Sequence, residues 1–151
     1  MLGSLIRRCA MVALLVAAAA TGAAAQRVNA DRHGLAVKGY DVVAYFVEGR
    51  AVPGDARFEH ALDGVRYRFA SAANRDRFAQ EPQRFLPQYG GFCAWAVSRG
   101  YTAPTDPLAW RIVDGRLYLK YDRSVQREWE GDIKGNVAKA DTNWPGLSRA
   151  R

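Results

Sequence analysis

Two segments of the chain alternate between apolar and polar residues, and each is interrupted by Asp-Gly. The first covers residues 58–69 around Asp-Gly at 63–64, and the second covers residues 110–121 around Asp-Gly at 114–115. An Asp-Gly dipeptide inside an alternating segment is typical of a β-hairpin with a two-residue turn. The pattern therefore predicts two antiparallel hairpins.

The turn positions fix which side chains share a face of each hairpin. In the first hairpin they predict the cross-strand pairs Leu62–Val65, His60–Tyr67 and Phe58–Phe69. Side chains alternate with a period of two, so these six residues lie on one face and His60 points toward the apolar side. In the second hairpin the shared face holds Trp110, Ile112, Leu117 and Leu119.

Helices are predicted between and after the hairpins. Ser71 can cap a helix that runs to Gln80, and Pro82 suits the first turn of a short helix that follows. Residues 92–98 fit a short helix or a buried strand, and residues 41–46 fit a strand or one helical turn. Gly100, Pro104 and Pro107 indicate a loop before the second hairpin.

The last part of the chain carries a helical stripe. Asp122 can cap its first helix. Val125, Trp129, Ile133 and Val137 recur every four residues, and Gly131 and Gly135 are expected to break the stripe into two pieces. Together these elements predict an α+β fold, a small antiparallel sheet from two β-hairpins packed with four or five short helices.

The N-terminus has the pattern of a secretory signal peptide. Two arginines precede an apolar run that is too short to span a bilayer, and an Ala-x-Ala sequence ends at Ala25. We expect residues 1–25 to be a cleaved signal peptide and the protein to be periplasmic or secreted. Residues 26–34 are then a flexible N-terminal arm, residues 35–147 a single domain, and residues 148–151 a C-terminal tail.

The net charge and the absence of several catalytic motifs limit the classes of function that the sequence supports. The 22 Lys and Arg residues exceed the 15 Asp and Glu residues, for a formal charge of +7. An exported protein meets no cytosolic nucleic acid, so we interpret the basic residues as a solvated face with weak contact to an anionic membrane surface. The sequence has no phosphate-binding loop, no Gly-x-Ser-x-Gly and no His-Glu-x-x-His.

Cys93 is the sharpest candidate for chemistry. After removal of residues 1–25 it is the one remaining cysteine, in a compartment that is oxidising. It follows Gly90-Gly91 near an expected helix start, which can lower the pKa of a thiol. The alternative is a small buried residue among Phe92, Trp95 and Val97.

His60 and the carboxylates are weaker candidates. On the apolar hairpin face, His60 is either a metal ligand or proton carrier, or a core histidine with one hydrogen bond. The carboxylates are spread singly along the chain, without a local pair that indicates acid–base chemistry. Asp41 is best explained as a structural hydrogen-bond acceptor.

Three segments together resemble the YHS domain family. The first is the spaced pattern of Gly64, Tyr67, Phe69, Ser71, Phe78, Pro82 and Phe85. The other two are residues 38–46 and 89–98. A fourth group, Asp141, Asn143, Trp144 and Pro145, supports them. The last three groups resemble the exported branch of that family. The similarity covers most of residues 35–147.

The resemblance implies heavy-metal handling, often of copper, through cysteines. The family's usual cysteine positions correspond here to Ala70 and Asn74, so the ligands left for a copper or zinc ion are Cys93 and His60. Some exported relatives are described as selenoproteins, and the resemblance puts selenocysteine at the position of Cys93, which favours redox chemistry.

Three hypotheses follow from these residues. The first is a metal-associated binding module that uses Cys93 and His60 and exchanges its ion with a metal-transfer partner. The second is a thiol redox protein in which Cys93 is the catalytic thiolate and a redox partner supplies the second thiol. The third is a non-catalytic envelope interaction domain in which Cys93 only packs.

Overall fold

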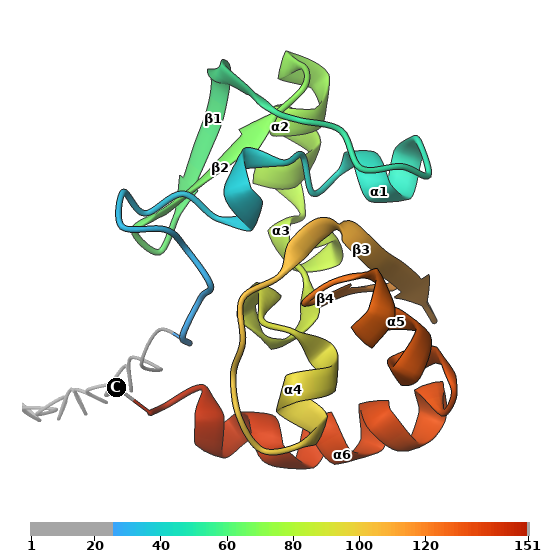
Figure 1. The fold of residues 1–151 in the computed structure, drawn as a ribbon. Coiled ribbons are helices and arrows are strands. Elements are labelled where there is room, and N and C mark those ends of the chain that lie inside the picture. The colour runs from blue at the N-terminus through green and yellow to red at the C-terminus, as the bar shows by residue number, and fades with distance from the viewer. Residues whose placement is uncertain (1–25, 151) are drawn as a thin grey trace, which may run out of the picture.

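The computed structural model describes residues 26–150, so the predicted signal peptide lies outside the described residues. In chain order the elements are η1 (Val37–Gly39), α1 (Ala44–Val47), β1 (Asp55–Leu62), β2 (Val65–Phe69), α2 (Ala72–Gln80), α3 (Pro82–Phe85), η2 (Gln88–Gly91), α4 (Ala94–Ser98), β3 (Asp106–Val113), β4 (Arg116–Lys120), α5 (Arg123–Glu130) and α6 (Ile133–Leu147). Here η marks a 3₁₀-helix. The α+β class is confirmed, with six α-helices in this part of the chain (Figure 1).

The first hairpin keeps its predicted register only near the turn. The pairs Leu62–Val65 and His60–Tyr67 are confirmed. The pair Phe58–Phe69 is wrong, because the register shifts between Asp55 and Glu59 and Phe69 pairs with Asp55 instead. An irregularity of this kind adds residues to one strand and displaces every pair beyond it.

The second hairpin has the predicted apolar face. Ile112 pairs with Leu117 and Trp110 with Leu119. Strand β3 starts earlier than predicted and includes Pro107, which we expected in a loop. Pro107 lies in the register shift between Asp106 and Trp110, where a strand tolerates a missing N–H. Each hairpin remains a separate two-stranded sheet.

Side-chain caps start two of the helices as predicted. The Ser71 hydroxyl accepts a hydrogen bond from the Asn74 N–H at 3.1 Å ahead of α2, and the Asp122 carboxylate accepts one from the Val125 N–H at 2.8 Å ahead of α5. For two segments the sequence allows either a helix or a strand. Residues 92–98 form a helix from Ala94, and residues 41–46 lead into the helical turn α1.

The helical stripe is divided into two helices at Gly131, as predicted, but the prediction that Gly135 also breaks it is wrong. Gly135 lies in the first turn of α6, and its N–H donates to the capping carboxylate of Asp132 at 2.9 Å. A Cβ on Gly135 would collide with that carboxylate, so the glycine makes room for the cap. No helix within residues 26–150 is long and apolar enough to cross a membrane.

Strand β4 separates two apolar clusters. The hairpin core joins β1, β2 and the first helices, and its central residues are Val42, Tyr45, Tyr67, Phe69, Phe78 and Phe85. The helical core joins η2, α4, α5 and α6, and it holds Tyr89, Phe92, Val97, Trp129 and Ala140. Leu117 and Leu119 belong to the first cluster and Tyr118 to the second, as the period of two along a strand requires. In Figure 1 the first hairpin and α2 lie above the second hairpin, α4, α5 and α6.

Asp41 holds the hairpin core together, which confirms its expected role as an acceptor. One carboxylate oxygen accepts from the N–H groups of Val43 and Ala44 at 2.8 and 3.1 Å, and the other accepts from the Ala70 N–H and the Asn74 amide at 2.9 and 2.8 Å. The side chain is fully buried. One carboxylate thus connects α1, the end of β2 and α2.

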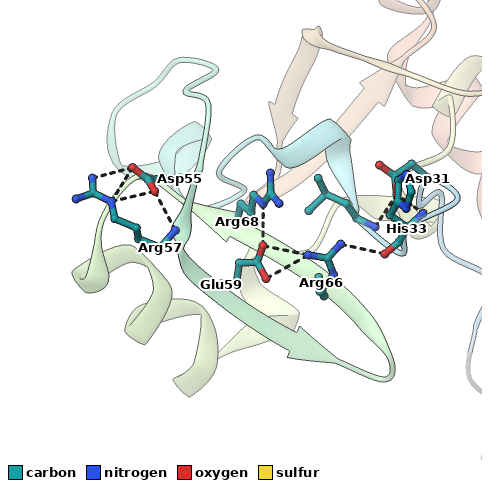
Figure 2. A network of polar contacts seen from close by, with 8 residues as sticks. Asp31, His33, Asp55, Arg57, Glu59, Arg66 and Arg68 are labelled. Atoms are coloured by element: carbon teal, nitrogen blue, oxygen red, sulfur yellow. Dashed lines mark hydrogen bonds and ion pairs between the residues drawn. The ribbon is translucent and has the colours of Figure 1, made fainter.

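The outer face of the first hairpin is charged. Glu59 accepts from Arg68 at 2.8 Å and from Arg66 at 3.1 Å, and Asp55 pairs with Arg57 (Figure 2). The Arg66 guanidinium also donates to the carbonyl of His33 at 3.0 Å. These groups are partly or fully exposed, and ion pairs in contact with water contribute little to stability.

The segment expected to be a flexible arm, residues 26–34, packs on the domain in the structure. The Arg27 N–H donates to the Ser148 carbonyl at 3.2 Å, and the Asn29 N–H donates to the Gly90 carbonyl at 2.9 Å. The Asn29 amide adds a hydrogen bond to the Gly91 carbonyl at 3.2 Å. Backbone groups that pair with distant segments hold this stretch in place, which patterns of local sequence do not reveal.

Candidate functional site

Cys93 lies immediately before α4, beneath the loop that leads to the second hairpin. Its backbone N–H donates to the Ala103 carbonyl at 3.0 Å. Its Sγ accepts a hydrogen bond from the Tyr121 N–H at 3.3 Å. The residue is a free cysteine with 1% of its surface exposed. The thiol is therefore held in a defined orientation, and large reagents do not reach it in this conformation.

Lys120 is the charged neighbour of this thiol, since Tyr121 follows it directly in the chain. Lys120 ends β4 and shares the face of Tyr118, so the strand places its side chain in the helical core, where it is fully buried. Its Nζ donates to the Tyr118 carbonyl at 3.2 Å and lies 4.2 Å from the centre of the Trp129 ring. Among the described residues no carboxylate forms an ion pair with it.

The surroundings of Lys120 favour the neutral amine. Burial lowers its pKa to about 7, the charges of Glu130 and Cys93 act in the opposite direction, and Arg111 adds to the lowering. A buried ammonium loses its hydration and recovers little of it from one carbonyl and one aromatic face. Near neutral pH the amine can therefore take up a proton, and the charge of Cys93 acts on it.

The indole of Trp129, beside Lys120, lacks a hydrogen-bond partner among the described residues. The Trp129 indole N–H is buried and has no hydrogen-bond acceptor within the part of the chain that the structure describes. Buried polar groups are normally paired, and exceptions gather at sites with a function. Cys93, Lys120 and Trp129 thus form a buried polar group, which we call the thiol–amine site.

The two predicted metal ligands do not meet. The ring of His60 packs edge-on against Phe78 at 5.7 Å, beside the hairpin core, whereas Cys93 lies against β4 and the loop before β3. Across residues 26–150 no group of three or more His, Cys, Asp or Glu side chains could hold a metal ion. The copper or zinc site stays a prediction.

Lys120 was missed because the strand was interpreted from one face only. Leu117 and Leu119 mark one apolar face of the second hairpin in the sequence. The other face, which carries Tyr118, shows no alternating pattern that would predict its burial. The signal was the following helix, whose stripe of Val125, Trp129, Ile133 and Val137 needs an apolar surface of its own. A strand covered on both sides buries every residue, including a lysine.

Comparison with protein-family models, with curated proteins and with solved structures finds no match.

Proposed function

We propose that this is an exported thiol redox protein in which Cys93 is the catalytic nucleophile and Lys120 accepts its proton. The observation that carries the proposal is a fully buried lysine without a carboxylate partner in the described residues. It directly precedes Tyr121, whose N–H donates to the free thiol of Cys93. A lysine costs stability in such a position. The resemblance to exported YHS proteins, with selenocysteine at the position of Cys93, supports the same chemistry.

The substrate that suits this site is a hydroperoxide, because Cys93 is buried and only a small oxidant can approach it. The Cys93 thiol gives its proton to the Lys120 amine, and the thiolate sulfur attacks one peroxide oxygen. The O–O bond breaks, and the departing hydroxide takes the proton back from the Lys120 ammonium and leaves as water. Cys93 becomes a sulfenic acid, and the peroxide is reduced.

A partner must restore the thiol, since Cys93 is the only cysteine in residues 26–150. A thiol of the partner attacks the sulfenic sulfur and releases water, which leaves a mixed disulfide. A second partner thiol then attacks that disulfide, so the partner leaves oxidised and Cys93 is a thiol again. This exchange needs the protein to open around Cys93, because the residue is buried in the structure.

Replacing Lys120 by methionine tests the pairing directly. Methionine fills a similar volume but carries no base, so we expect the rate at which hydrogen peroxide oxidises Cys93 at pH 7.5 to fall about a hundredfold or more, the usual contribution of general base catalysis. The measurement removes the peroxide with catalase at set times, unfolds the protein in urea with dimedone present so that the sulfenic acid becomes accessible, and quantifies the adduct at Cys93 by peptide mass spectrometry.

Lys139→Met is the matched control, since Lys139 is an exposed lysine on α6 and its loss should leave the rate unchanged. The peroxide reaction is repeated at increasing urea concentrations. If Cys93 reacts only in proportion to global unfolding, or if Lys120→Met and the wild type react equally, the thiol is a packing residue and the proposal is wrong.

A further inference from the structure

A cavity in the described part of the chain is separate from the thiol–amine site. It has a volume of about 750 Å³ and lies among the turn of the first hairpin, η2 and the end of α6. Its walls include Arg27, Tyr67, Gln88, Arg116, Asp141 and Trp144. Small-molecule sites usually occupy about 300–1,000 Å³, so the cavity is large enough for a ligand of several rings.

One wall of this cavity is built at a cost in backbone strain. Tyr89 has a φ of 57°, which is uncommon for a residue with a bulky side chain. This conformation lets the Tyr89 hydroxyl donate to the Asp141 carboxylate at 2.8 Å and sets its ring 6.0 Å from that of Trp144. A Cβ on Gly90 would collide with the Arg27 carbonyl, so a glycine there allows the N-terminal segment to close the wall.

Sequence motifs that the redox proposal does not use converge on the cavity. Tyr67 comes from the first hairpin, Tyr89 and Gly90 come from the segment before Cys93, and Asp141 and Trp144 come from the last helix. These segments are far apart in the chain and belong to the patterns that carry the family resemblance. Tyr67 and Tyr89 belong to the two cores, whereas Asp141 is exposed in the cavity wall, so the meeting of these segments leaves a carboxylate free to bind a ligand.

The charges in the walls indicate a neutral ligand. Two guanidiniums, of Arg27 and Arg116, and two carboxylates, of Asp63 and Asp141, line the cavity. None of the four forms an ion pair with a side chain of the described part of the chain. Positive and negative groups are equal in number, so a ligand of either sign would be attracted by one pair and repelled by the other.

The uncharged wall groups suit a neutral ligand that both donates and accepts hydrogen bonds. Gln83 and Gln88 each present a donor and an acceptor, and a hydroxyl likewise donates and accepts. The half-buried ring of Trp144 offers an apolar surface between these polar groups. A ligand with apolar ring faces and a rim of hydroxyls matches both features.

We propose that this cavity binds a short neutral saccharide, with sugar hydroxyls bound by Asp141, Arg116 and the two glutamines and a sugar face against Trp144. The proposal is independent of the thiol chemistry, because Cys93 does not line the cavity. A Cys93→Ser variant is therefore expected to keep the same affinity for the saccharide.

Isothermal titration of the purified protein with maltotriose and with the trimer of N-acetylglucosamine tests the proposal. We expect at least one of them to bind, and Asp141→Asn to weaken that binding about tenfold or more, the usual effect of losing a charged hydrogen-bond acceptor. The asparagine amide of this variant keeps an oxygen that can accept from the Tyr89 hydroxyl, so the fold should persist, which a thermal melt checks.

Asp76→Asn is the control, since Asp76 is an exposed carboxylate on α2 that is not part of the cavity. Glucose 6-phosphate and triglutamate serve as anionic probes. Binding of the anionic probes alone, absence of binding by both neutral trisaccharides at millimolar concentration, or equal affinity of Asp141→Asn and the wild type would each overturn the proposal.

Discussion

Replacing Asp41 by alanine is expected to lower the free energy of unfolding by at least about 4 kcal/mol, enough to unfold much of the protein. The buried carboxylate accepts four hydrogen bonds, three from backbone N–H groups and one from the Asn74 amide. Alanine leaves all four donors without a partner, and each buried donor costs about 1–3 kcal/mol when unpaired. Urea denaturation followed by tryptophan fluorescence measures the loss.

Asp41→Asn separates the hydrogen bonds from the volume of the side chain. Asparagine keeps one acceptor oxygen but puts an NH₂ group against two donors, so we expect a loss nearly as large as that of alanine. Asp76→Ala removes an exposed carboxylate of the same type, and its effect should stay within about 0.5 kcal/mol. A loss below about 1 kcal/mol for Asp41→Ala would contradict the role assigned to this residue.

The parts of the fold that could be predicted are those that local chemistry decides. An Asp-Gly turn sets the register of its nearest pairs, so Leu62–Val65 and Ile112–Leu117 follow directly. Ser71 and Asp122 cap helices because the N–H groups of the first helical turn have no acceptor inside the helix, and a side-chain oxygen just before the helix can accept from them.

The rest depends on contacts between distant segments. The register shift in β1 moves Phe69 away from Phe58 and is not encoded near the turn. α6 continues past Pro145, although proline usually ends a helix, because Trp144 and Leu147 pack into the helical core. The same reason applies to the candidate site. Cys93 could be chosen from its type alone, whereas its neighbour Lys120 appears only once α5 covers the second face of β4.

Lys120 should also make the stability of the protein depend on pH in a definite direction. Its pKa is lowered from 10.5 to about 7 by burial in the folded state. Between these two values the unfolded chain binds more protons than the folded protein, so the free energy of unfolding rises with pH. At about 1.4 kcal/mol per pKa unit, we expect a gain on the order of 3 kcal/mol between pH 7 and pH 10, with no gain from this group below pH 6.

The buried tyrosines limit that gain at high pH. Burial raises the pKa of Tyr67 to about 12, and burial raises the pKa of Tyr45 and Tyr89 as well. Above pH 10 the tyrosines of the unfolded chain lose protons that the folded protein retains, so stability falls again. The stability of the wild type should therefore be highest near pH 9–10.

Lys120→Met isolates the contribution of the lysine to this curve. The variant has no ammonium to bury, so it should be more stable than the wild type at pH 6–7, by an amount on the order of 2–3 kcal/mol, and should lack the rise between pH 7 and pH 10. Urea denaturation at unit pH steps measures both, with Lys139→Met as a control that keeps the wild-type curve. Parallel curves for Lys120→Met and the wild type would mean that the amine is already hydrated in the folded state, and then it has no lowered pKa with which to take the thiol proton.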